Sequence, residues 1–237
     1  MIDWIAFDAD DTLWTNELLY REARSRFAQL MAPYATPDQA GDKLDQIEIG
    51  NLGDYGFGIK SFTLSMIEAA LALTGVQPEG RVIEQILGLA RDMHHAELRV
   101  FDQVEETLTQ LSERYPLMLV TRGDSFEQER KVRRSGLAGY FRAVEVVGDK
   151  SVEIYDRLLT KHGIAPRGFL MVGNSMRADV LPVLALGGMA VHVPYVHTWS
   201  YDVAEEPPVD DGRYFELAHL GELPPLLARL EERGAGS

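Results

Sequence analysis

The sequence predicts an α/β protein, a doubly wound parallel sheet interrupted by an all-helical insertion. Short, nearly continuous apolar runs occur at 2–7, 117–120, 143–147, 169–172 and 189–193, and each stops at a polar or glycine-containing loop. Runs of this length are typical of strands covered on both faces, and parallel strands need helical crossovers. Between the first and second runs the sequence carries helical periodicity and no convincing strand.

Helical periodicity also separates the later runs. Apolar residues recur at helical spacing in two segments, as Val104, Leu108, Leu111 and Tyr115 and as Val152, Tyr155, Leu158 and Leu159. Gly163 follows the second stripe as a helix C-cap. Ser125 and Gln128 have capping-box spacing for a helix whose charged residues, 127–134, we expect to form a solvated face.

The insertion contains three apolar stripes at helical spacing. They are Leu19, Ala23, Phe27 and Leu30, then Leu64, Ile67 and Leu71, then Val82, Ile86, Leu89 and Met93. We therefore expect an α/β core formed by 1–14 and 100–237 and a helical domain formed by 15–99. The glycine-rich segment 51–60 is expected to be a flexible loop between helices.

Composition excludes several classes of protein. The 237 residues are 46% apolar and 25% charged, as in a soluble globular protein. A net charge of −14 disfavours nucleic-acid and anionic membrane partners, so we expect neither. The absence of cysteine excludes disulfides, thiolate metal sites and cysteine nucleophiles and fits a cytoplasmic protein. The oligomeric state is left open.

Polar residues follow each predicted strand. They are Asp8, Asp10 and Thr12 after the first, Thr121, Arg122 and Gly123 after the second, Lys150 after the third, and Asn174 and Asp179 after the fourth. Because the carboxyl ends of parallel strands meet at one edge of the sheet, where ligands bind, we expect these groups to converge.

The two aspartates that follow the first strand suit phosphoryl chemistry. We expect Asp8 to act as a nucleophile and Asp10 to transfer protons. A carboxylate that attacks a phosphate meets repulsion of about 4 kcal/mol per unit-charge pair at contact when the effective dielectric constant is near 20. Compensating cations are therefore needed, and Lys150 is one.

Oxygen donors at the same edge suit Mg²⁺. Asp8 and Asp179, with Asp10 and Asn174, are the candidate metal ligands, since Mg²⁺ prefers hard oxygen ligands. An Asp179 placed at the N-terminus of a helix that starts near Val180, with Pro182 in its first turn, would fit this site.

Four other residues at the edge could hold a substrate, and one of them, Thr121, is a candidate catalytic residue beside Asp8, Asp10 and Lys150. Thr121 could donate a hydrogen bond to a phosphoryl oxygen, and Gly123 would let the backbone approach it closely. Thr12 and Arg122 are further candidate substrate-binding residues.

These segments, taken together, resemble the four motifs of the haloacid dehalogenase (HAD) superfamily, in the right order. The stretch 8–13 is similar to the first motif, 121–123 to the second, Lys150 to the third, and 173–179 to the fourth. The helical insertion is similar to the cap of the first type that members of the family carry between their first and second motifs. The resemblance implies a Rossmann-like core with an inserted cap domain.

The resemblance also implies a two-step reaction. Asp8 would attack phosphorus to give an aspartyl-phosphate while Asp10 protonates the leaving alcohol, and Asp10 would then take a proton from the water that hydrolyses the intermediate. An acidic residue at position 10 argues against the dehalogenase branch. The fourth motif usually opens with an acid where this chain has Asn174, so the resemblance implies weaker metal binding.

Residues of the insertion are candidates for recognising the leaving group. Tyr55 could stack on it, Lys60 could meet a second anionic group, and Asn16 lies at the entry to the insertion. If 51–60 is only a connecting loop, these residues have no such role.

The sequence therefore predicts a Mg²⁺-dependent phosphatase that acts on a small phosphorylated metabolite. Three alternatives remain open at this point: a phosphomutase of the same superfamily, a metal-independent 2-haloacid dehalogenase, and a non-catalytic binding module. The sequence does not identify the substrate.

Overall fold

A computed structural model describes residues 2–75, 77–204 and 212–235. The chain forms two compact units, one made of Met1–Thr15 and Leu98–Ser237 and the other of Asn16–Glu97. We call them unit 1 and unit 2. The assignment of a catalytic role to unit 1 and a cap role to unit 2 stays a prediction.

Unit 1 is built on a six-stranded sheet. Its strands are β1 (Trp4–Phe7), β2 (Leu117–Arg122), β3 (Ala143–Val147), β4 (Phe169–Gly173), β5 (Met189–His192) and β6 (Tyr214–Glu216). Their order is β3-β2-β1-β4-β5-β6, and every pair is parallel. This arrangement confirms the predicted doubly wound fold. The short edge strand β6 was not expected from the sequence.

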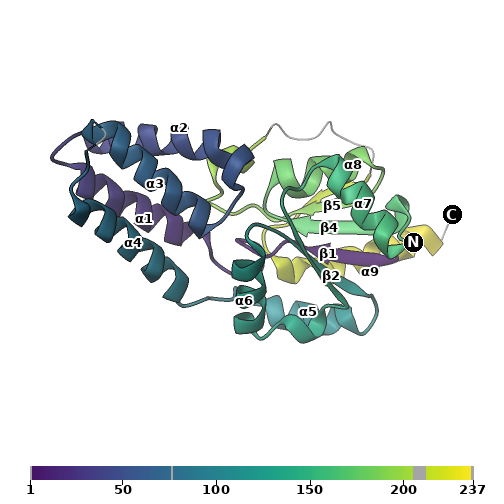
Figure 1. Ribbon diagram of the computed structural model, residues 1–237. Helices are drawn as coiled ribbons and strands as arrows, with labels where there is room; N and C mark the ends of the chain where they lie inside the picture. Colours follow the sequence, from purple (N-terminus) through teal and green to yellow (C-terminus); the bar gives the residue numbers. More distant parts are fainter. Residues whose placement is uncertain (1, 76, 205–211, 236–237) are drawn as a thin grey trace. The chain divides into compact units, whose positions relative to one another are not determined.

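Helices cover both faces of this sheet (Figure 1). They are α5 (Val104–Ser112), α6 (Ser125–Ser135), α7 (Val152–His162), α8 (Leu181–Ala185) and α9 (Leu223–Ala235). Because side chains alternate along a strand, Ile5 and Phe7 pack in one apolar cluster with Leu108, while Ala6 packs in a second cluster with Leu158. The two clusters hold the strands rigidly, and the loops at their carboxyl ends are carried on that frame.

The residues of unit 2 that the structure describes form four helices, one more than the apolar stripes predicted. They are α1 (Glu17–Met31), α2 (Pro37–Tyr55), α3 (Ile59–Thr74) and α4 (Gly80–His95). Helix α2 escaped prediction because its buried stripe contains the charged residue Glu48, which pairs with Arg24 of α1 at 2.5 Å. The expectation of a loop over 51–60 was wrong for most of its length, since only 56–58 separates α2 from α3.

The chain passes between the two units at a pair of antiparallel segments within unit 1. Trp14 bridges Val100, the Thr15 amide donates to the Arg99 carbonyl oxygen at 3.0 Å, and the Phe101 amide donates to the Leu13 carbonyl oxygen at 3.0 Å. We call this pairing the clasp. It places the start and the end of the insertion beside each other.

Among the described residues, none of the helices combines the length and the apolar character that a bilayer crossing requires.

Candidate active site

Asp8 lies at the carboxyl end of β1 and is held from both its backbone and its side chain. Its amide donates to the carbonyl oxygen of Val172 on β4 at 2.9 Å, which keeps it in register with the sheet. Lys150 Nζ lies 2.5 Å from Asp8 Oδ1 and 2.6 Å from Asp179 Oδ1. All three side chains are buried, so one ammonium is shared by two carboxylates at the predicted edge. We call Asp8, Lys150 and Asp179 the Asp8 centre.

Burial and charge act in opposite directions at this centre. Burial raises the pKa of Asp8, the Lys150 ammonium lowers it, and Asp179 raises it again, which leaves the pKa near 7. Burial lowers the pKa of Lys150, but the two carboxylates more than offset this and raise it above its ordinary value. Lys150 is therefore a permanent cation of the site.

Thr12 and Asn174 form a second layer behind Asp8. Thr12 Oγ1 lies 3.0 Å from Asp8 Oδ2 and 3.2 Å from Asn174 Oδ1, and it accepts from the Asn174 amide at 3.1 Å. Asn174 Nδ2 donates to Thr198 Oγ1 at 3.2 Å. Both ends of the Asn174 carboxamide thus have protein partners, and the Thr12 hydroxyl ties the first motif to the fourth.

The sequence led us to expect Asp179 at the start of a helix, and this expectation was wrong. Asp179 lies inside a single π-helical turn, Met176–Val180, which precedes α8. Its Oδ2 accepts from the Ser175 amide at 3.0 Å. A Cβ on Gly173 would come within 2.2 Å of Asp179 Oδ2, so the glycine makes room for the carboxylate to fold back over the end of β4. Turns of this kind are frequent at functional sites.

Asp10 is held by a different set of donors. Trp14 Nε1 donates to its Oδ1 at 2.7 Å, and its Oδ2 accepts from Gln128 Nε2 at 2.9 Å and Lys131 Nζ at 2.8 Å. Burial raises the pKa of Asp10, but the Lys131 ammonium and the three hydrogen bonds outweigh burial and leave the pKa below its ordinary value. We call Asp10, Trp14, Gln128 and Lys131 the Asp10 centre.

The expectation of a fully solvated helix face over 127–134 was wrong in part. Glu127, Gln128 and Lys131 are buried, whereas Glu129 and Arg133 are exposed. The expected capping box is also replaced, since α6 is capped by Asp124, whose Oδ1 accepts from the Glu127 amide at 3.0 Å. Sequence reasoning missed Gln128 and Lys131, although α6 contains few apolar residues that could face the sheet.

The second motif supplies an unpartnered hydroxyl. Thr121 is buried, and its Oγ1 has no hydrogen-bond partner among the described residues. A buried hydroxyl normally has a partner, so this atom is a candidate donor to a bound anion. Gly123, with φ of 141°, leaves room for Gln128, because a Cβ there would lie 3.1 Å from Gln128 Nε2, and its predicted role beside a phosphoryl group stays a prediction.

Arg122, at the end of β2, is paired with a carboxylate. One terminal nitrogen of its guanidinium donates to both oxygens of Asp202, at 2.9 and 2.8 Å. Asp202 ends a short 3-10 turn after β5, Ser200–Asp202, and the ring of Tyr201 in this turn is centred 4.1 Å from the Arg177 guanidinium carbon. The role of Arg122 in binding a substrate stays a prediction, and Asp202 is a neighbour that no sequence motif identified.

The donor set at the Asp8 centre suits a hard divalent cation. Asp8 and Asp179 already share a cation, and Mg²⁺ is typically bound through one or two carboxylates, with water and substrate oxygens completing its shell. No group of three or more acidic or histidine ligands occurs among the described residues, consistent with Asn174 in place of an acid. The Asp10 carboxylate contacts Trp14, Gln128 and Lys131, and its role as a metal ligand stays a prediction.

The candidates from the insertion all belong to unit 2. Asn16 is the N-cap residue of α1, with no side-chain capping bond. Tyr55 is exposed at the end of α2, and its hydroxyl donates to Glu68 Oε1 on α3 at 2.9 Å. Lys60 is exposed in the first turn of α3. Their contact with a substrate stays a prediction.

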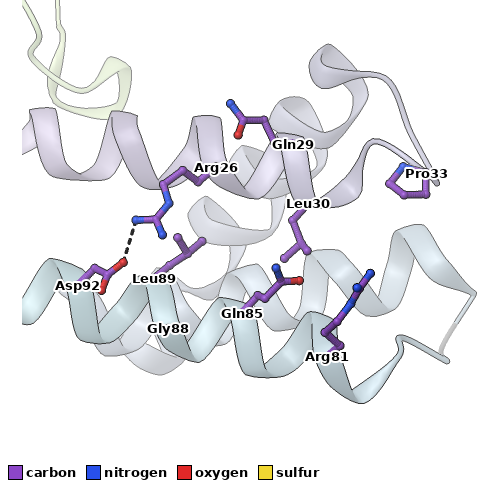
Figure 2. Close-up of a pocket in the computed structure, with 9 residues that line it drawn as sticks. All are labelled: Arg26, Gln29, Leu30, Pro33, Arg81, Gln85, Gly88, Leu89 and Asp92. Carbon is purple, nitrogen blue, oxygen red and sulfur yellow. Dashed lines mark hydrogen bonds and ion pairs between the residues drawn. The ribbon is translucent and has the colours of Figure 1, made fainter.

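Unit 2 also contains a cavity between α1 and α4 (Figure 2). It measures about 570 Å³, and an ion pair between Arg26 and Asp92 at 2.8 Å spans its wall. Both side chains are about half exposed, and the described lining includes no buried titratable group.

The chain matches known proteins both in sequence and in overall structure. Residues 2–187 match the family of haloacid dehalogenase-like hydrolases. The structure superposes with a TM-score of 0.87 on a haloacid dehalogenase-like family hydrolase from Xanthomonas campestris, at 34% identity over 100% of this chain and 95% of that chain.

Two curated relatives are named as phosphatases. A glyceraldehyde 3-phosphate phosphatase of Methanopyrus kandleri is 25% identical over 94% of this chain and 96% of its own. An N-acylneuraminate-9-phosphatase of Mus musculus is 23% identical over 74% of this chain and 75% of its own.

Proposed function

The chain belongs to the haloacid dehalogenase-like hydrolases, and we propose that it is a Mg²⁺-dependent phosphatase that hydrolyses a small phosphorylated metabolite. The single observation that carries the proposal is the Asp8 centre. A buried carboxylate at the end of β1 is compensated by one ammonium at 2.5 Å. The phosphatase names of two relatives support the same class of substrate.

The first step forms a bond between Asp8 and phosphorus. A carboxylate oxygen of Asp8 attacks the phosphorus atom in line, and the bond from phosphorus to the ester oxygen breaks. The departing alkoxide takes a proton from the Asp10 carboxyl. Lys150 balances part of the added charge, and the unpartnered Thr121 hydroxyl is available to a phosphoryl oxygen.

The second step returns Asp8 to its starting state. Water attacks the phosphorus atom of the aspartyl-phosphate and gives a proton to ionised Asp10, while the bond between phosphorus and Asp8 breaks to release inorganic phosphate. The three donors around Asp10 stabilise its ionised form, which is the form this step needs.

Asp8 and Asp179 are the residues that would hold Mg²⁺, with Asn174 or water completing the shell. A divalent cation there supplies charge compensation for the phosphoryl group and favours the ionised form of Asp8.

The test is release of phosphate from p-nitrophenyl phosphate and from a panel that includes glyceraldehyde 3-phosphate and N-acylneuraminate 9-phosphate, with Mg²⁺ and with EDTA. We expect Mg²⁺-dependent release by the natural protein, none by Asp8→Asn, and full release by Asp156→Asn, an exposed aspartate on α7.

Other results would contradict the proposal in distinct ways. Halide release from a 2-haloacid in EDTA would indicate a dehalogenase. Turnover of a sugar phosphate that needs a bisphosphate activator would indicate a phosphomutase. No turnover of any compound by a folded protein would indicate a binding module.

A further inference from the structure

Lys131 of α6 lies outside every motif that identified the site, yet it is buried against Asp10. We propose that Lys131 is the positioning residue of Asp10, and that together with Gln128 it leaves Asp10 Oδ1 as the oxygen that exchanges protons with the leaving group and with water. This inference rests on the proposed function, since it concerns the proton-transfer residue of that reaction.

The contacts fix the orientation of the Asp10 carboxylate. Lys131 Nζ and Gln128 Nε2 both donate to Oδ2, at 2.8 and 2.9 Å, and Trp14 Nε1 donates to Oδ1 at 2.7 Å. A carboxylate offers about four acceptor positions, two on each oxygen. Both positions on Oδ2 are therefore filled by described residues, and one position on Oδ1 is left for a substrate or a water.

The burial of Lys131 needs a long-range partner to explain it. Its side chain is only 10% exposed, and an ammonium withdrawn from water is strongly destabilised unless it is paired. Glu127, one turn earlier on α6, lies 3.3 Å away. Because this pair lies within one helix, it would form whichever way that face of the helix pointed, and it does not explain why Lys131 is buried. The shorter contact, to Asp10, is the one that directs the ammonium toward the end of β1.

The local backbone holds this arrangement in place. Gln128 Nε2 also donates to the carbonyl oxygen of Arg122 at the end of β2, at 3.2 Å. Gly123 leaves the space that the Gln128 carboxamide occupies. The N-cap bond from the Glu127 amide to Asp124 fixes where α6 begins. The position of Lys131 relative to Asp10 is thus set by the turn between β2 and α6.

Steady-state kinetics with p-nitrophenyl phosphate and β-glycerophosphate test the role. Lys131→Met removes one of the two donors to Oδ2 and leaves only Gln128 there, which loosens the hold on the carboxylate, and a misplaced proton-transfer group lowers turnover by up to about 100-fold. We expect that loss in kcat for β-glycerophosphate with KM changed by less than about twofold, because binding in the ground state is untouched.

Two further variants separate positioning from general damage. Lys131→Arg, which keeps the cation, should recover part of kcat. Arg133→Met removes a cation from the exposed face of the same helix and should leave kcat unchanged. Loss of stability in Lys131→Met with unchanged kcat would overturn the proposal.

A double-mutant cycle in urea unfolding tests the contact without any reference to activity. If Lys131 holds Asp10, Lys131→Met and Asp10→Asn should destabilise the protein less together than the sum of their separate effects. Additive effects would overturn the proposal. If the natural protein releases no phosphate, the proposed function fails, while the cycle still decides whether the two side chains act as a pair.

Discussion

Asp8 and Asp10 leave the same strand two residues apart, yet they sit in two different electrostatic environments. The Lys150 ammonium forms ion pairs with both Asp8 and Asp179, and the pKa of the buried Asp8 rises to about 7. Lys131 holds Asp10 together with neutral donors from Gln128 and Trp14, and the pKa of Asp10 falls. Burial raises the pKa of both carboxylates, but at Asp10 the Lys131 ammonium and two neutral donors outweigh burial, whereas at Asp8 the neighbouring Asp179 adds to it.

The comparison also shows what the protein alone does not supply. The proposed nucleophile, Asp8, should be ionised, and the proposed acid, Asp10, should carry a proton in the first step, whereas the contacts favour the reverse. A divalent cation at Asp8 and Asp179 would favour ionised Asp8, and an arriving phosphoryl group, being negative, would raise the pKa of Asp10. Ligands are thus expected to exchange the protonation states of the two centres.

The largest expected effect is that of Asp10→Asn, which should slow the second step of the reaction and spare the first. p-Nitrophenolate departs without a proton, so Asp10→Asn should still form the aspartyl-phosphate from p-nitrophenyl phosphate but hydrolyse it about 10²–10⁴-fold more slowly. Stopped-flow absorbance should show a burst of one nitrophenol per site followed by slow turnover. A variant with no burst and no turnover would show that Asp10 is needed for both steps with this ester.

The next effect concerns the cation of the Asp8 centre. Lys150→Met leaves two buried carboxylates without their ammonium, and breaking a buried pair destabilises a protein by about 3–5 kcal/mol. Urea unfolding measures the loss. Lys161→Met is the matched control, because Lys161 makes an exposed pair with Glu145, which is worth about 0–1 kcal/mol. Equal losses in both variants would refute the buried pairing.

A smaller effect follows from the raised pKa of Asp8. A carboxyl whose pKa is raised on folding stabilises the fold while it is protonated, so in EDTA the stability should fall as the pH rises from about 4 through about 7. Asp8→Asn cannot ionise and should lose this dependence, which makes it the more stable protein at pH 8. Thermal unfolding of both proteins at pH 5 and pH 8 checks this expectation. Parallel pH profiles of the natural protein and Asp8→Asn would contradict the raised pKa of Asp8.

The smallest effect concerns the link behind Asp8. Thr12→Val keeps the shape and removes the hydroxyl that joins Asp8 to Asn174, which leaves buried polar atoms unpaired at a cost of about 1–3 kcal/mol. Thr160→Val, at an exposed position of α7, should change the free energy of unfolding by less than about 0.5 kcal/mol. A change of that size in Thr12→Val as well would mean that the link is dispensable.

The central strands of the sheet could be predicted because they are buried on both faces. The segments around Ile5, Leu119 and Leu170 read as continuous apolar runs, which only a covered parallel strand requires. The strand β6 has only three residues, Tyr214–Glu216, which is too short for an apolar run to stand out. Helix α2 was missed because burial of Glu48 depends on Arg24 of a different helix.

The Asp8 centre was predictable from strand ends, and the Asp10 centre was predictable only in part. Asp8, Lys150 and Asp179 each follow a strand, and the parallel topology alone brings them together. Lys131 is 121 residues from Asp10 and belongs to a helix face that appears solvated in the sequence. One signal was available, since α6 buries a single aliphatic residue, Val132, and its remaining sheet-facing positions had to be polar.

The clasp has a consequence for how such proteins can diversify. Leu13 and Phe101 are hydrogen-bonded neighbours although a whole helical unit intervenes between them in the chain. Because the free-energy cost of closing a loop rises only slowly with its length, the sheet tolerates an insert of almost any size between these two points. A lineage could therefore exchange or enlarge its helical unit wholesale while the machinery of the sheet edge stays unaltered.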